Sequence, residues 1–375
     1  MLDDVSGFGG FPFTVARPRR VFTGFRPLEH RGCSQVGRGI PLRQGAFSMT
    51  TARFAALASL LTLALLIGVL AGGSAISPGA VLYALLHPRA EGDIATIVWQ
   101  LRVPRVAIGM VVGASLSVGG ALLQGMLRNP LVDPYLTGVS AGAACVIALA
   151  ILAGVAAPVL PALGFAAGLG TAVLVAALAR RGSGIDPTRL ILAGISISAL
   201  FSAIVALAIA RANSLDAAQS ILAWLAGSMA GHGWTDLRFC IPYLVAGFAL
   251  ALLAVPALDA LRIGDLRARA VGLNVDRAQW IILAATSLLA ASSVALAGMV
   301  GFVGLIVPHV ARRIVGSDAR RLLPASALLG AALCTVADAC ARTIVAPSEL
   351  PIGILLAFIG VPAFLYLYLH SEFAS

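Results

Sequence analysis

The chain has 375 residues, of which 59% are hydrophobic and 11% charged, and its formal net charge is +10. Its mean hydropathy of +0.97 lies far outside the range of soluble globular domains. This composition excludes a soluble domain as the main body of the protein. It predicts a membrane protein whose surroundings are lipid, with no nucleic acid among its partners.

Residues 1–48 differ from everything that follows them. They contain no apolar run and hold seven arginines, three acids and many glycines and prolines. Such a segment is predicted to be a disordered or non-native extension, with the natural start at Met49 and a disordered cytoplasmic tail as the alternative. The first apolar run could instead be a cleaved signal sequence ending at residues 73–75, although it is long for a signal core.

Ten apolar runs follow, each near the roughly 17 to 25 residues that a helix needs to cross a bilayer core. They lie near residues 54–73, 106–126, 138–156, 161–179, 190–210, 239–258, 280–300, 302–316, 324–342 and 350–369. The run at 302–316 is short and contains Pro308, so nine or eleven spans are the alternatives. The predicted fold is an all-α polytopic membrane domain over residues 49–375, with about ten transmembrane helices.

Arginine is distributed unevenly between the two sides of these spans. With the amino terminus inside, the connections on the cytoplasmic side hold twelve arginines, and the outer connections and span ends hold six. Because cytoplasmic loops retain positive charge, both termini are expected in the cytoplasm of a bacterium, with the chain in its inner membrane.

All 26 basic residues are arginines, so the chain contains no lysine. A standard P-loop needs a lysine that reaches the nucleotide phosphates, and Schiff-base chemistry also needs one. Five cysteines, at positions 33, 145, 240, 334 and 340, have no metal-ligand spacing and are expected to be unpaired thiols. We therefore expect a chain that is not an enzyme and binds no metal or cofactor of its own.

Residues 261–277, here called the coupling segment, are unusually charged for this chain. They read LRIGDLRARAVGLNVDR and hold four arginines and two aspartates. On a helix, Leu266, Val271 and their apolar neighbours can share one side while Arg262, Asp265 and Arg269 face another. The segment is either a solvated loop or a short amphipathic helix that docks into a soluble cytoplasmic partner.

Six motifs carry a resemblance that covers residues 50–370. They are WQLRVPR (99–105), GGALLQGMLRNPLVDPYLTGVSAGA (119–143), RLILAGISISAL (189–200), LRIGDLRARAVGLNV (261–275), ALAGMVGFVGLIVPHVARRIVGSDARRLLP (295–324) and ELPIGILLAFIGVPAF (349–364). In this order they resemble the FecCD-type permeases of type II ATP-binding cassette (ABC) importers, which carry cobalamin, haem and ferric siderophores.

The resemblance implies a homodimer of permeases that works with two cytoplasmic ATPase subunits and a periplasmic binding protein. ATP and magnesium would then be bound by the ATPase and not by this chain. In that family the counterpart of the coupling segment is a coupling helix seated in the ATPase. The residues implied in this contact are Gly264, Asp265, Arg267, Arg269, Gly272 and Leu273.

Three arginines on the predicted outer side oppose the usual charge bias. Arg102 and Arg105 lie in the WQLRVPR motif, and Arg342 lies near the end of the ninth span. The resemblance implies that they dock glutamates of the binding protein. Contact with lipid headgroups is the alternative for all three, and an ion pair with Asp338 one turn earlier is the alternative for Arg342.

The sequence NPLVDP at 129–134 has two prolines between runs that would otherwise merge. A broken backbone at membrane depth is tolerated where it is buried or lines an aqueous cavity. A simple turn is the alternative. The resemblance implies a cytoplasmic gate that includes Asn129 and Leu131, together with Pro187 and Thr188 before the fifth span.

The fifth span is similar to the helix that lines the translocation path near the dimer axis. Ser196, Ser198 and Ser202 on this span and Arg211 at its end are the candidate path residues, with close helix packing as the alternative for each serine. His309 in the VPHV motif is interpreted as a structural histidine, since the resemblance places it near the cytoplasmic end of its helix.

The expected mechanism is alternating access, driven by ATP hydrolysis on the partner chain and transmitted through the coupling segment. A gradient-driven secondary transporter is the alternative, but it needs ionisable residues inside the spans, where Asp338 stands almost alone. A membrane protein without transport activity is a third class. The sequence does not select the cargo, and an iron chelate is the leading hypothesis.

Overall fold

The computed structural model describes residues 44–72, 76–88, 92–182, 184–346 and 348–370. The described residues from Gly45 onward belong to one compact unit. The predictions for residues 1–43, including Cys33, and for the possible cleavage site at 73–75 lie outside the described residues. Residues 44–48 are part of the first helix, which begins before Met49.

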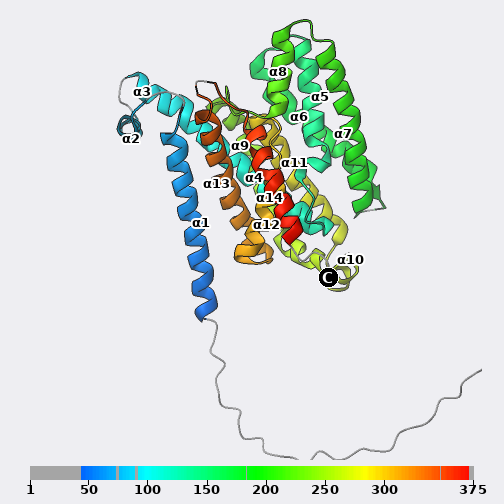
Figure 1. Cartoon of the computed structure of the whole chain (residues 1–375). Helices are drawn as coiled ribbons and strands as arrows, with labels where there is room; N and C mark the ends of the chain where they lie inside the picture. The colour runs from blue at the N-terminus through cyan, green and yellow to red at the C-terminus, as the bar shows by residue number, and fades with distance from the viewer. Residues whose placement is uncertain (1–43, 73–75, 89–91, 183, 347, 371–375) are drawn as a thin grey trace, which may run out of the picture. The chain divides into compact units, whose positions relative to one another are not determined.

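The described chain is almost entirely helical (Figure 1). In chain order its elements are α1 (Gln44–Leu70), α2 (Pro78–Leu86), α3 (Asp93–Thr96), the π-helix η1 (Ile97–Arg102), α4 (Val103–Leu127), the 3-10 helix η2 (Pro134–Thr137), α5 (Val139–Leu152), η3 (Ala157–Val159), α6 (Leu160–Ala179), β1 (Arg180–Arg181), β2 (Gly184–Ile185), α7 (Pro187–Ala210), α8 (Leu215–Ala226), α9 (Trp234–Arg262), α10 (Asp265–Ala270), α11 (Val275–Ala297), α12 (Val303–Val315), α13 (Ala319–Thr343) and α14 (Ile352–His370).

Each of the ten predicted spans coincides with a helix. Within the described residues, seven helices are long and apolar enough to cross a membrane by themselves, and α5 and α14 are shorter apolar helices. The fold is therefore an all-α polytopic membrane protein, as predicted. Within the described residues three α-helices were not predicted, α2, α3 and α8, because with nine, four and twelve residues they are too short for a search for spans.

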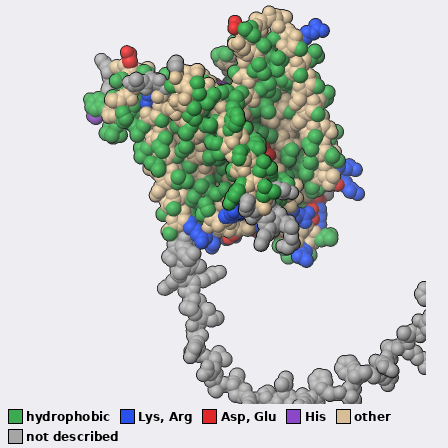
Figure 2. Space-filling model, viewed as in Figure 1, with side chains coloured by type: hydrophobic (Ala, Val, Ile, Leu, Met, Phe, Trp, Pro, Cys, Tyr) green, Lys and Arg blue, Asp and Glu red, His purple; other side chains and the backbone are tan. Residues whose placement is uncertain are grey.

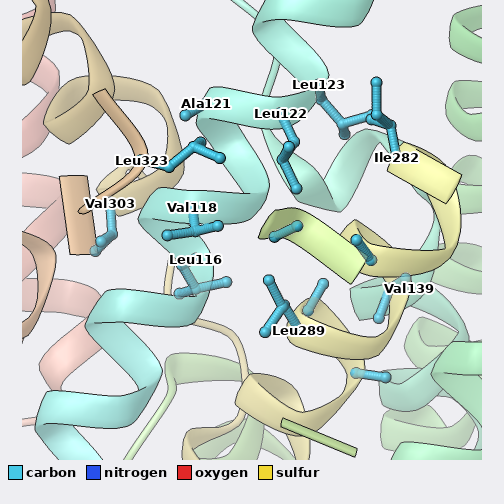
Figure 3. Close-up of a cluster of buried hydrophobic side chains, with 14 of the residues drawn as sticks. Leu116, Val118, Ala121, Leu122, Leu123, Val139, Ile282, Leu289, Val303 and Leu323 are labelled. Carbon is cyan, nitrogen blue, oxygen red and sulfur yellow. The ribbon is translucent and has the colours of Figure 1, made fainter. Parts of the chain in front are cut away.

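Helix α4 lies at the centre of the bundle, where α9, α11, α12 and α13 pack against it. Its leucines and valines meet residues from several of these helices, among them Ile282, Leu289, Val303 and Leu323 (Figure 3). Glycines allow the closest approaches: a Cβ atom at Gly113 would overlap the carbonyl of Gly330 on α13. Small residues at helix interfaces are typical of membrane bundles, which pack without a strong hydrophobic driving force.

Two interruptions of the helices are supported by one buried side chain. The amide nitrogen of Gln124, a residue only 3% exposed, donates to the carbonyls of Val132 (3.2 Å), Gly304 (3.1 Å) and Leu305 (3.2 Å). The first carbonyl belongs to the NPLVDP segment before α5, and the others belong to the start of α12. A side-chain donor thus replaces the water that would satisfy irregular backbone elsewhere.

The long helices differ in how much of their surface the chain itself covers. In the apolar 18-residue stretch of each long helix, 78% of the residues are buried for α11 and for the continuous helix that ends with α4. The same share is only 17% for α1 and for α7. Figure 2 shows hydrophobic side chains spread over the flanks and arginines gathered at the ends. The exposed faces of α1 and α7 must therefore meet lipid or another chain.

Candidate coupling, gate and docking sites

The coupling segment forms a short helix between two glycine turns. Helix α10 covers only Asp265 to Ala270, and the glycines at its two sides, Gly264 and Gly272, have φ angles of +107° and +86°. These left-handed values disfavour residues with a Cβ atom. The helix is anchored by Ala268, which is completely buried, while Leu273 donates its amide to the Ala268 carbonyl at 3.0 Å.

Two large apolar residues of the coupling segment, Leu266 and Val271, point away from the chain's own core. Leu266 is 86% exposed and Val271 is 71% exposed, and Arg267 and Arg269 are exposed beside them. Figure 1 places α10 at the end of the bundle opposite α2 and α3. Adjacent exposed apolar side chains rimmed by charges mark a surface for protein interaction.

An ion pair links the coupling segment to the first gate candidate. Arg128 ends α4 in a left-handed conformation, with φ +52°, and its guanidinium lies 3.1 Å from the Asp265 carboxylate. Asn129, the first of the gate candidates, follows directly. Its side chain accepts the Leu131 amide at 2.9 Å, and Leu131 itself is 45% exposed.

A second set of contacts links the coupling segment to the other gate candidate. Arg269 pairs with Asp276 at the start of α11. A methyl group at Gly184 would lie 2.6 Å from the Asp276 carboxylate, so β2 packs directly on this residue. One turn along α11, Gln279 accepts the amide of Ile185 at 2.9 Å. The β1–β2 hairpin is therefore fixed to the helix that follows the coupling segment.

The hairpin leads directly into α7 through an aspartate cap. The Asp186 carboxylate accepts the amides of Thr188 (3.0 Å) and Arg189 (3.1 Å), and Pro187 occupies the first helical position. Donation from the Arg189 amide and from the Arg181 side chain holds the pKa of Asp186 below its usual value. The cap is thus complete above the ordinary pKa of an aspartate and is lost as the pH falls through the lowered value.

Two of the three predicted docking arginines are buried at the carboxyl end of α1. Arg102 is 5% exposed and donates to the carbonyls of Val69 and Leu70, both at 3.1 Å. Arg342 is 4% exposed and donates to the carbonyls of Gly68 (2.8 Å) and Ala71 (3.1 Å). Both cations therefore satisfy carbonyls that the end of a helix leaves without amide donors.

The third docking arginine lies between two acids. Arg105 donates to Asp338, with the closest N–O distance 2.9 Å, and to Glu349, also at 2.9 Å. Arg342 also pairs with Asp338, at an N–O distance of 3.0 Å. The ion pair that the sequence offered as the alternative to docking for Arg342 is therefore present. Glu349 has 39% of its side chain exposed, the largest share in this arginine cluster of Arg105, Asp338, Arg342 and Glu349. Docking itself stays a prediction.

Comparison with known proteins bears on the whole described chain. The model of the FecCD transport family matches residues 60–370. This chain belongs to the FecCD transport family. The sequence resemblance is thereby confirmed.

FecCD relatives match along most of their length. The Fe(3+)-citrate import system permease protein YfmE of Bacillus subtilis is 38% identical over 83% of this chain and 92% of its own length. The hemin transport system permease protein HmuU of Yersinia pestis is also 38% identical, over 83% and 95%. The cobalamin import system permease protein BtuC of Halobacterium salinarum is 40% identical over 74% of each chain.

A solved structure supports the same fold. It is described as an inward-facing conformation of a metal-chelate type ABC transporter. It superposes with a TM-score of 0.76 at 32% identity, covering 86% of this chain and 99% of the other.

The candidate path residues of this FecCD permease lie on α7, one of its two least covered long helices, or directly after it. Ser196, Ser202 and Arg211 are exposed, and Ser198 is half-buried. Helix α7 packs on the chain through other positions, including Gly194, where a Cβ atom would overlap the Leu136 carbonyl. Ser196 and Ser202 therefore lie on faces that the chain itself does not cover, whereas Ser198 is partly covered, and the path role of all three stays a prediction.

Three residues that contact the candidate sites were missed by the sequence analysis. Arg128 and Glu349 stand inside motifs that were recognised, directly before Asn129 and at the start of ELPIG. Only in the folded chain does Arg128 reach Asp265 and Glu349 reach Arg105. Gln279 could not be found from the sequence, because its partner, the amide of Ile185, is 94 residues away and is known only from the packing of the helices. Among the described residues, no cluster of three His, Cys, Asp or Glu side chains could hold a metal ion.

Proposed function

We propose that this chain is the permease subunit of an ABC importer that carries a metal chelate or cobalamin across the bacterial inner membrane. Two permease copies, two ATPase subunits and a periplasmic binding protein form the working complex. Both termini lie in the cytoplasm, as the arginine distribution favours. ATP and magnesium are bound and ATP is hydrolysed on the ATPase.

The observation that carries the proposal is the position of α10. Its exposed side presents Leu266, Arg267 and Val271 to a partner. The same helix is tied to both gate candidates through the ion pairs Arg128–Asp265 and Arg269–Asp276. A partner that displaces α10 therefore moves the start of α7 and the loop after α4 together.

Alternating access follows from this arrangement. ATP binding and hydrolysis move the partner surface against α10, and the two sets of contacts pass this movement to residues 129–131 and 187–188. Each contact is worth little, because the ion pairs are exposed to solvent. Small differences in contact free energy between the two states suffice to drive the conformational change, since a ligand shifts a conformational equilibrium only by its differential affinity.

At the opposite end, the loaded binding protein docks over the arginine cluster, where Glu349 is the most exposed side chain and Arg102 and Arg342 bind the end of α1. Asp338, the acid that a gradient-driven mechanism would need, is paired with two arginines. This pairing favours a structural role for Asp338 and supports ATP-driven transport. Cargo then passes between the two permeases along α7.

A ferric siderophore is the proposed cargo. Named relatives of nearly equal identity carry Fe(3+)-citrate, hemin and cobalamin, so identity alone does not choose among them. Several further relatives, among them the Fe(3+) dicitrate permease FecD of Escherichia coli and the iron(3+)-hydroxamate permease FhuB of Bacillus subtilis, also handle ferric chelates.

The proposal is tested in proteoliposomes that contain the permease and its ATPase, with loaded binding protein outside and ATP inside. Uptake of radiolabelled ferric siderophore, haem and cobalamin is compared. We expect ATP-dependent uptake of the ferric siderophore, and its loss together with release of the ATPase in Leu266→Glu.

Ile344→Glu is the matched control, because Ile344 is also an exposed apolar residue, 60% exposed, but follows α13 at the other end. This variant should retain the ATPase. Uptake of all three cargoes without ATP, or full ATPase binding by Leu266→Glu, would overturn the proposal.

A further inference from the structure

A groove of about 470 Å³ opens between α9 and α13 and reaches the central helix α4. Phe248, Leu252 and Val255 form one wall and Leu323 the other. Leu252, 68% exposed, stands at the rim, and Val118, 3% exposed, forms part of the floor. The groove therefore connects the lipid-facing surface to the core through an apolar channel of the size that binds small ligands.

Prolines shape both walls of the groove. Pro256 lies inside α9 and Pro324 inside α13, and both line the groove. Because proline has no N–H, the carbonyls of Leu252 and Arg320, four residues earlier, lose their intrahelical donors. Within a bilayer such carbonyls favour any neighbouring hydroxyl or amine donor.

One end of the groove is closed and basic. Asp259 on α9 accepts the Ala319 amide at 2.9 Å, and Arg262 donates to the Ser317 carbonyl, so the two helix ends are joined. Arg320, exposed at this end, is the charged residue among those that line the groove. Within the described part of the chain, its guanidinium has no ion pair within 4.0 Å.

We propose that this groove binds one anionic phospholipid of the adjacent leaflet. An acyl chain lies along Phe248, Leu252 and Val255, and the phosphate is bound by Arg320. A glycerol headgroup supplies a hydroxyl donor at the Arg320 carbonyl. The arrangement combines an apolar channel open to the bilayer with an unpaired cation at its closed end, which matches the two halves of a phospholipid.

The test is native mass spectrometry of the full chain with palmitoyl-oleoyl phosphatidylglycerol, compared with the phosphatidylcholine of the same acyl chains. Arg320→Ala should retain about fivefold less phosphatidylglycerol, the change expected for one arginine near an anionic lipid. Arg320→Lys should retain most of it. Ala327→Phe, which fills the groove and keeps the guanidinium, should lose as much lipid as Arg320→Ala.

Arg321→Ala is the matched control, since Arg321 is the next residue, lies near Asp318 at 4.0 Å and does not line the groove. Thermal unfolding of each variant shows whether the bundle is intact, and Arg320→Ala tests the site even if Ala327→Phe does not fold. Equal loss in Arg320→Ala and Arg321→Ala would overturn the proposal. So would displacement of the lipid by soluble glycerol phosphate, or a groove variant that separates two copies of the chain while lipid retention is unchanged.

Discussion

The arginine cluster shows how residues with one charge take different roles in a membrane protein. Arg102 and Arg342 lie almost fully inside the bundle and bind the last carbonyls of α1. Arg105 is held by one buried acid and one exposed acid. Glu349, and not an arginine, is thus the most exposed side chain of the cluster.

Asp338→Asn should destabilise the permease strongly. Its carboxylate, 3% exposed, pairs with both Arg105 and Arg342. Removing one partner from a buried ion pair leaves uncompensated charge and costs about 3 to 5 kcal/mol. The thermal unfolding midpoint of the purified protein should fall well below that of Asp318→Asn, an exposed helix cap. An unchanged midpoint would show that the pair does not hold these helices together.

Glu349→Gln should increase the affinity of the binding protein for the permease. The substitution releases one side of Arg105 for an incoming carboxylate. An exposed ion pair is worth up to about 1 kcal/mol, so the gain should be up to about fivefold. Surface plasmon resonance on the reconstituted permease measures it, with Asp216→Asn as an exposed control. Weaker binding would instead make Glu349 a direct contact.

At the scale of elements, local sequence signals gave the helices, but not their relation to each other. Helix α10 was expected within 261–277 and covers only 265–270, because Gly264 and Gly272 end it on both sides. The amphipathic pattern of the coupling segment did not indicate which side of α10 packs on the rest of the chain. The fold buries Ala268 and leaves Leu266 and Val271 exposed, so these two side chains are open to a partner.

Gln279→Leu should uncouple ATP hydrolysis from transport. The change removes the acceptor of the buried Ile185 amide, which costs about 1 to 3 kcal/mol, and loosens the hairpin before α7. Cargo carried per ATP hydrolysed should fall at least about fivefold. Gln219→Leu, at an exposed position on α8, should change neither the rate of ATP hydrolysis nor the rate of transport. If hydrogen exchange at residues 180–186 becomes faster while transport per ATP is unchanged, the hairpin does not take part in coupling.

At the scale of the whole molecule, α1 and α7 are the least covered long helices. Both expose large apolar residues beside small ones, for example Leu63 and Ser59 on α1 and Leu200 and Ser202 on α7. Exposure alone therefore does not separate a lipid-facing helix from one that meets a second copy. The resemblance to FecCD-type permeases implies that the counterpart of α7 lies near the dimer axis, so α7 is the predicted contact.

Ser202→Cys should form a disulfide between two copies in a cysteine-free background. In a twofold interface, a residue near the axis meets its own counterpart. Leu63→Cys on α1 is the control, because its helix is covered to the same small extent. Oxidation followed by non-reducing electrophoresis should give a dimer band with Ser202→Cys alone. A dimer only with Leu63→Cys would place the interface at α1.

The sequence by itself determined the membrane class, the ten helical runs, the family and the candidate sites. These properties depend on composition and on residues adjacent in the chain, since hydropathy and motifs are local. Only the tertiary structure decided which charges are satisfied and which surfaces stay open. Arg128 meets Asp265, Gln279 meets Ile185, and the α9–α13 groove reaches α4 because packing brings together segments separated by many residues.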